Sequence, residues 1–143
     1  MAESEVQQLL RRAVRNSDSA AMREAIDRLF AGGKDALSAE AEYQLRHEDY
    51  VMEMPQSGER IRGREAMRSM QEAYPTPPAI TIRRVAGSGS LWVLEGVNDY
   101  GDDVWHVILV LELDHEGRFV RDTRYYSQPF DPPAWRAQWV EPI

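Results

Sequence analysis

The sequence predicts an α+β fold in which N-terminal helices pack on a strongly curved, mainly antiparallel sheet. In the first third of the chain, apolar residues recur at helical spacing, as in Met22, Ala25, Ile26 and Leu29. From Tyr50 onward, apolar and polar residues alternate instead, which is typical of strands with one covered face. Gly- and Asp-containing separators at hairpin spacing join the last four candidate strands. Helices followed by an antiparallel meander indicate the α+β class.

The N-terminal region is expected to contain three helices. Residues 6–14 carry apolar side chains at helical spacing, and residues 16–19 provide turn and N-cap chemistry. The amphipathic helix that follows is expected to stop at Gly32 and Gly33. A short Ala-rich helix is expected from about residue 34 to residue 45. The chain length predicts a single domain over residues 1–143, with residues 1–18 as an N-terminal helical extension.

The rest of the chain is expected to be mostly strand. One helix is expected after Gly63, ended by Pro75 and followed by an extended loop at residues 76–78. The Pro- and Trp-rich C-terminal tail, residues 129–143, is expected to be non-helical and to wrap the surface. The candidate strands cover residues 50–54, 60–62, 80–85, 91–99, 104–113 and 118–127.

Composition excludes several classes of function. The chain has 17 basic against 24 acidic residues, a formal charge of −7, which argues against a nucleic-acid partner. It has no cysteine, so disulfides and thiolate chemistry are excluded. The longest apolar run, residues 107–111, is far too short for a membrane span. A secretory signal begins with basic residues followed by an apolar stretch, whereas the first five residues here are acidic. We therefore expect no secretory signal and a cytoplasmic protein.

Alternation along the strands separates an inner face from an outer one. Between residues 104 and 113 the odd-numbered side chains are uniformly apolar and are expected to face inward, whereas the even-numbered set is mixed. In the last strand alternation alone leaves two candidate faces. One face carries Asp122 and Arg124, two residues apart.

Two local patterns resemble a known family. Residues 47–63 look like a strand, hairpin and helix entry of the SnoaL-like branch of the nuclear transport factor two-like superfamily. Residues 114–120, followed by Arg124, Tyr125 and Tyr126, look like its last hairpin and strand. The resemblance covers the chain from about Ala20 onward. It implies a cone formed by the curled sheet, with an internal apolar cavity open at one end. Members include polyketide cyclases, ketosteroid isomerases, epoxide hydrolases, dehydratases and non-catalytic binding domains.

Similarity to the isomerases would turn Asp122 and Arg124 into the cavity. There the carboxylate is the candidate general base and the guanidinium the candidate electrophile. A salt bridge tying the strand to a helix or to the tail is the competing interpretation, and it is favoured by the residues alone. No cofactor is implied, and no metal, because consecutive His47, Glu48 and Asp49 cannot converge on one ion in a strand. The candidate ligand-binding residues are Tyr50, Met52, Met54, Trp92, Asn98, Trp105, Leu109 and Tyr126.

The chain also departs from the better-known enzymes of the superfamily. The isomerase base would fall at Met54, and its oxyanion-hole donors near Ala25 and at Leu109, none of which can ionise or donate. The epoxide hydrolases have a carboxylate where this chain has Arg124. Two functions therefore stay open. One is a domain that binds a small hydrophobic molecule in the cavity and acts as a cofactor-independent lyase, cyclase or isomerase. The other is a non-catalytic binding or scaffold domain that forms a homodimer through its outer sheet face.

Overall fold

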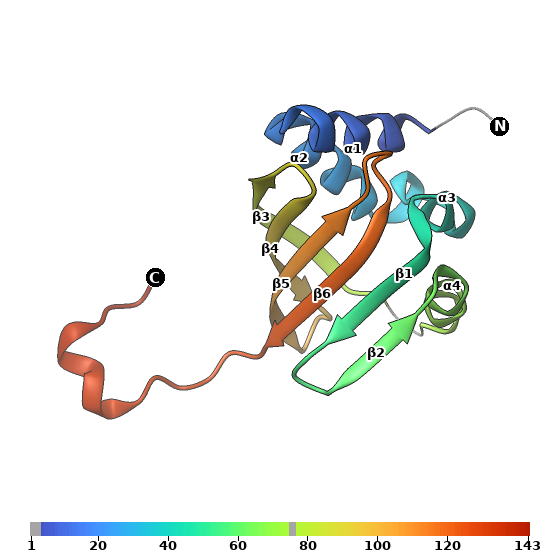
Figure 1. Ribbon diagram of the computed structural model, residues 1–143. Helices are drawn as coiled ribbons and strands as arrows, with labels where there is room; N and C mark the ends of the chain where they lie inside the picture. Colours follow the sequence, from blue (N-terminus) through green and yellow to red (C-terminus); the bar gives the residue numbers. More distant parts are fainter. Residues whose placement is uncertain (1–3, 75–76) are drawn as a thin grey trace.

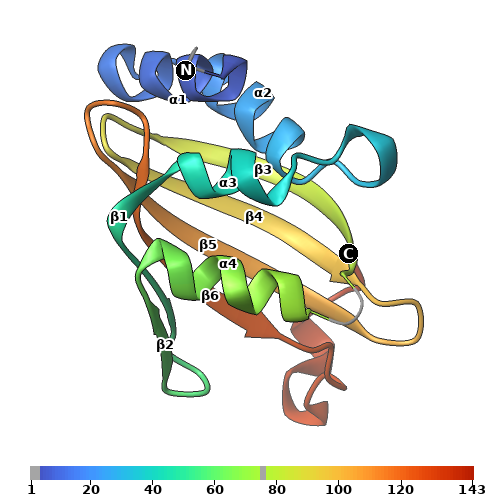
Figure 2. The same cartoon turned by 90° about the vertical axis from the view of Figure 1, so that its right-hand side faces the viewer.

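Helices cover one side of a six-stranded mixed sheet that does not close on itself (Figures 1 and 2). The computed structural model describes residues 4–74 and 77–143. Helices α1 and α2 cross one end of the sheet, and α3 and α4 lie along its concave face. This arrangement confirms the predicted α+β class. The helices are α1 (Glu5–Asn16), α2 (Ser19–Leu29), α3 (Ala39–Gln44) and α4 (Arg64–Ala73).

The first two helices form where the periodicity predicts them. In α1 the buried side chains are Val6, Leu9, Leu10, Ala13 and Val14, which share one helical face. Ser4 caps α1 by accepting a hydrogen bond from the backbone N–H of Gln7, and Asp18 caps α2 in the same way. The buried stripe of each helix therefore faces the sheet and its partner helix.

The helix predicted over residues 34–45 is wrong in its extent. A single 3-10 turn, Gly33–Asp35, is followed by extended backbone at Ala36, and α3 begins only at Ala39, capped by Ser38. Asp35 and Ser38 are residue types that favour caps and turns over helix interiors, and Ser38 provides the N-cap of α3. The chain turns directly from α3 into the first strand, so α3 lies beside the start of that strand.

The strand order in the sheet is β2-β1-β6-β5-β4-β3, and only the β1–β6 pair is parallel. The register places the inner residues opposite one another, with Leu111 between Trp92 and Asp122 and with Leu109 between Leu94 and Arg124. The odd-numbered inner face predicted for residues 104–113 is the buried one from Val107 onward. The strands are β1 (Arg46–Met54), β2 (Glu59–Arg62), β3 (Ala79–Ser88), β4 (Leu91–Asp99), β5 (Val104–Leu113) and β6 (Phe119–Ser127).

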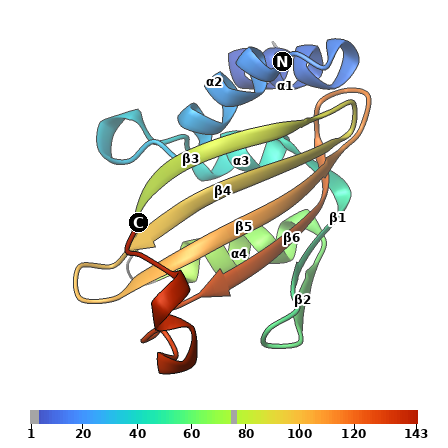
Figure 3. The ribbon, with the colours of Figure 1, turned by 90° about the vertical axis from the view of Figure 1, so that its left-hand side faces the viewer.

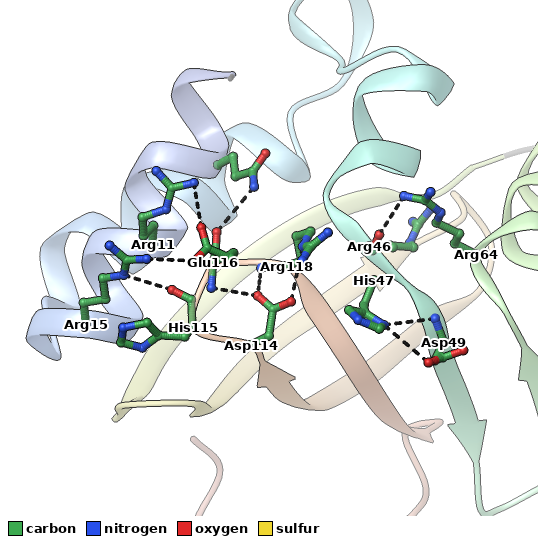
Figure 4. Close-up of polar contacts among 11 residues, drawn as sticks. Arg11, Arg15, Arg46, His47, Asp49, Arg64, Asp114, His115, Glu116 and Arg118 are labelled. Carbon is green, nitrogen blue, oxygen red and sulfur yellow. Dashed lines mark hydrogen bonds and ion pairs between the residues drawn. The ribbon is translucent and has the colours of Figure 1, made fainter. Parts of the chain in front are cut away.

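The β5–β6 hairpin is attached to α1 by a set of polar contacts (Figure 4). Arg15 donates from Nε to the carbonyl of His115 at 3.0 Å and pairs through Nη2 with Glu116. Gly117, with φ of 80°, lies so close to α1 that a Cβ there would sit 2.5 Å from the backbone nitrogen of Arg11. Farther from this hairpin, Arg64 donates to the carbonyl of Arg46 and holds the start of β1 against α4. These contacts fix the two strands that carry the candidate site.

The tail differs from the expectation in two respects. It contains a 3-10 helix, Ala134–Trp139, because the ring of Pro133 can precede a helical turn although it cannot continue one. It also leaves the end of β6 and stands away from the sheet instead of wrapping the surface (Figures 1 and 3). Pro75 and Thr76, which are expected to end α4 and begin the loop, lie outside the described residues. In residues 4–74 and 77–143, no helix combines the length and apolar character that a membrane span requires.

Candidate functional site

The concave face of the sheet and the helices above it enclose an open cavity of about 1060 Å³. Nine of the ten predicted site residues line it: Tyr50, Met52, Met54, Asn98, Trp105, Leu109, Asp122, Arg124 and Tyr126. The exception is Trp92, which is fully buried in the core between the sheet and the helices. Its indole N–H donates to the carbonyl of Gly89 at 2.8 Å. The roles assigned to these residues stay predictions.

Asp122 is the only acidic side chain of the described residues that is almost completely buried, with 5% of its surface exposed. Its Oδ2 accepts three hydrogen bonds: one from the hydroxyl of Tyr50 at 3.0 Å, and two from Arg124, from Nε at 3.0 Å and from Nη2 at 2.7 Å. Tyr50 comes from β1 and the other two residues from β6, so the parallel β1–β6 pairing brings the three together. The Asp122–Arg124 ion pair therefore lies within β6. The interpretation favoured by the residues alone, a salt bridge from this strand to a helix or to the tail, is not what the structure has.

The electrostatics of this cluster keep its donors protonated. Burial would lower the pKa of the Arg124 guanidinium, but the charge of Asp122 outweighs it and raises that pKa well above its ordinary value. Burial, together with the charge of Asp122, raises the pKa of the Tyr50 hydroxyl. At neutral pH Tyr50 is therefore a phenol and Arg124 a cation, and both donate to the same carboxylate oxygen.

The second oxygen of Asp122 has no partner. Oδ1 is buried and accepts no hydrogen bond from any described residue. A buried carboxylate oxygen without a donor is uncommon, because it has lost its hydration without replacing it. Asp122 thus lines the cavity with Oδ2 accepting three hydrogen bonds and with Oδ1 buried and without a donor among the described residues.

Sequence reasoning missed a second polar group in the cavity wall. Arg46 is buried, and its guanidinium lies 5.3 Å from the centre of the Tyr50 ring. It donates to Gln71, which in turn donates to Glu42, each over 3.1 Å. Burial raises the pKa of the Glu42 carboxyl, and the nearby charge of Arg46 offsets part of that effect.

Two signals in the sequence point to this second group. Arg46 has the same parity as Tyr50 and Met52 and therefore lies on the inner side of β1. Gln71 follows the buried Met67 by four residues, so it lies on the same face of α4. The polar run at residues 47–49 hid the signal at Arg46 by suggesting that the strand begins at Tyr50.

The three positions at which the resemblance would place the isomerase base and its oxyanion-hole donors are apolar here. Met54 and Leu109 line the cavity, and Ala25 is completely buried in α2. No group of three or more His, Asp or Glu side chains in the described part of the chain is placed to hold a metal ion. The carboxyl groups among the cavity-lining residues are those of Glu42, Glu59 and Asp122.

Comparison with known proteins gives matches only among solved structures, since no family model and no curated protein matches the chain. An NTF-2 like protein of unknown function from Burkholderia xenovorans LB400 is 32% identical. It covers 92% of this chain and 98% of its own, with a TM-score of 0.72. A putative ketosteroid isomerase from Kribbella flavida is 23% identical over 96% of this chain and 89% of its own (TM-score 0.69).

An epoxide hydrolase of the LEH-like type from M. tuberculosis is 17% identical, over 85% of this chain and 80% of its own (TM-score 0.55). At these lower identities the isomerase and hydrolase matches show the fold alone. The match to the Burkholderia protein spans nearly the whole of both chains at 32% identity. The chain therefore belongs to the nuclear transport factor two-like family.

Proposed function

We propose that the protein binds a small, mainly apolar molecule in the cavity and holds it by one hydroxyl group. The observation that carries this proposal is the buried, unpartnered Oδ1 of Asp122. A ligand hydroxyl that donates to Oδ1 would satisfy this oxygen, and hydrogen bonds to charged groups are the stronger ones. Met52, Trp105 and Leu109 supply apolar wall around it.

The arrangement also supports an acceptor on the ligand. Arg124 donates to Asp122 through Nε and Nη2, and no described residue accepts a hydrogen bond from its Nη1. A ligand oxygen can therefore accept from Nη1 of Arg124 while its proton is donated to Asp122. An alcohol satisfies both groups with one atom, whereas a hydrocarbon satisfies neither.

Binding is tested with three bicyclic probes of nearly equal size: tetralin, β-tetralol and β-tetralone. Isothermal titration of the wild-type protein is expected to give a roughly tenfold to hundredfold lower Kd for the alcohol than for tetralin. Asp122→Asn is expected to remove most of this difference. Asp49→Asn, a change in an exposed carboxylate on the neighbouring strand β1, is expected to leave this difference unchanged. Equal affinities of the wild-type protein for tetralin and β-tetralol would contradict the proposal.

Proton transfer without a cofactor is the second candidate, and the proximity of Arg124 to the unpartnered oxygen favours it. Oδ1 of Asp122 would take a proton from the carbon next to a ligand carbonyl. The C–H bonding pair then forms an enolate, whose oxygen accepts from Arg124, and returning the proton to another carbon completes an isomerisation. This is the chemistry of the predicted lyase, cyclase or isomerase.

Deuterium exchange measures this step without knowledge of the substrate. The wild-type protein is expected to speed the incorporation of solvent deuterium into β-tetralone at the carbons next to its carbonyl. Proton NMR measures this incorporation as a loss of signal. Asp122→Asn should bring the rate back to that of buffer, and Asp49→Asn should not. Binding without any acceleration would favour the non-catalytic alternative.

We also propose that the outer sheet face pairs two copies of the chain. Val93, Ile108 and Tyr125 are exposed on neighbouring strands of that face, and the register places Ile108 directly opposite Tyr125. Apolar side chains gathered on one open sheet face are typical of an interaction surface. Sedimentation equilibrium of the wild-type protein tests this proposal, and a monomer at all concentrations would contradict it.

A further inference from the structure

The C-terminal arm, residues 129–143, carries large apolar side chains that its own domain does not cover. Phe130 and Trp135 are each 74% exposed and Trp139 is 72% exposed, more than any other aromatic residue of the described chain. Soluble domains rarely leave several such side chains together in water, because burying them is favourable. The arm therefore requires a surface that the isolated chain does not provide.

The direction of the arm indicates where that surface lies. The arm leaves the end of β6 and extends outward on the side of the sheet opposite the helices (Figure 1). A view onto the outer sheet face shows the arm in front of the strands, with α3 and α4 behind them (Figure 3). The arm thus lies on the outer side of the sheet, the face on which Val93, Ile108 and Tyr125 are exposed, and it stands away from the strands.

We infer that each arm lies across a second copy of this chain when two copies pair through their outer sheet faces. In such a two-fold arrangement, an arm that stands out from its own sheet points toward the partner, and the contact is made twice. This inference rests on the homodimer proposed above. It adds a definite role for the arm, which is to pack Trp135 and Trp139 against the partner subunit.

The area available is sufficient for a stable pair. A buried aromatic side chain covers roughly 150–250 Å², so three that are about three-quarters exposed offer roughly 350–550 Å² per arm. A standard interface needs about 800 Å² per partner. The arm therefore supplies about half of it, and the exposed residues of the sheet face supply further apolar area. The three aromatic side chains of the arm alone do not reach the size of a standard interface.

Because the chain has no cysteine, single introduced cysteines can report on the contact between two copies. Tagged Ala137→Cys protein, with its cysteine in the arm, is mixed with untagged Thr123→Cys protein, whose cysteine lies on the outer face of β6, and treated with a short bismaleimide. A product containing one chain of each kind is expected. Ser69→Cys is the matched control, because Ser69 is exposed on α4 behind the sheet, and it should give no such product.

Sedimentation equilibrium separates the possible failures. The wild-type protein is expected to be a dimer, and Trp135→Ser with Trp139→Ser should weaken it roughly a hundredfold or more. Tyr74→Ser, which removes an exposed aromatic at the end of α4, should leave the dimer unchanged. A wild-type monomer would overturn both the homodimer and the arm contact. A dimer that is unaffected by the double change in the arm, and that gives no mixed cross-link, would overturn the arm contact and leave the homodimer standing.

Discussion

Replacing Asp122 by asparagine should destabilise the protein because it leaves a buried cation without its counter-charge. Three hydrogen bonds, from Tyr50 and Arg124, converge on Oδ2, and Asp122 is the only acid that pairs with Arg124 in the described residues. Removing one partner of a buried ion pair costs roughly 3–5 kcal/mol. The Arg124 side chain keeps 20% of its surface exposed, so the lower end of this range applies, about 3 kcal/mol.

For a chain of this length, each kcal/mol corresponds to about 2–4 °C in Tm, so Asp122→Asn should lower Tm by about 6–12 °C. Urea unfolding followed by circular dichroism gives the free energy directly. The double change Asp122→Leu with Arg124→Met removes both charges together and should be more stable than Asp122→Asn. Asp49→Asn is the exposed control. A loss of less than about 0.5 kcal/mol in Asp122→Asn, or a double variant less stable than the single one, would refute this reasoning.

Two further predictions concern the wall of the cavity and the hairpin on α1. Burial raises the pKa of Glu42 above its ordinary 4.5, so the folded protein holds this proton more tightly than the unfolded chain does. The free energy of unfolding therefore falls as pH rises from about 4.5 through the raised pKa. Glu42→Gln should gain stability relative to the wild-type protein between about pH 4 and pH 7 in urea unfolding, and an equal difference at both pH values would contradict this. Gly117→Ala places a Cβ 2.5 Å from the backbone of Arg11, whereas Gly101→Ala, also at positive φ, meets open space. Thermal unfolding should show a cost of about 1–2 kcal/mol for Gly101→Ala and at least about 2 kcal/mol more for Gly117→Ala, and equal costs would be inconsistent with the close packing of the hairpin on α1.

The regular elements could be predicted because their signals are local. The apolar stripe of α1 and the alternation along β5 each repeat several times within one element, so a single exception does not change the result. The helix predicted over residues 34–45 failed for the converse reason. That segment is short and has no repeated apolar stripe, so the cap at Ser38 decided where α3 begins.

The cavity was harder to predict, because it depends on which segments meet. The contact between Tyr50 and Asp122 spans 72 positions and depends on the parallel pairing of β1 with β6, which alternation does not reveal. Arg46 is further obscured by an irregularity in that pairing between Arg46 and Val51. The family resemblance supplied the cone and the inward face of β6, whereas the unpartnered oxygen of Asp122 could only be found in the structure.

The tail shows a different limit. Its prolines predict a tail without any helix, and this prediction is wrong because a 3-10 helix needs only a short run without proline, which residues 134–139 provide. The direction in which a tail leaves the domain is set by the last strand and not by the composition of the tail. Figure 1 shows that this direction is outward, away from the sheet.

Methionine methyl NMR tests the central claim most directly, because the chain carries its own probes and its own control. Met52, Met54, Met67 and Met70 all line the cavity, whereas Met22 is completely buried in α2 outside it. On titration with β-tetralol, the methyl signals of the four lining methionines should shift together and saturate with a single Kd, while that of Met22 stays in place. If none of the four moves, or if Met22 moves as much as they do, the cavity is not the ligand site.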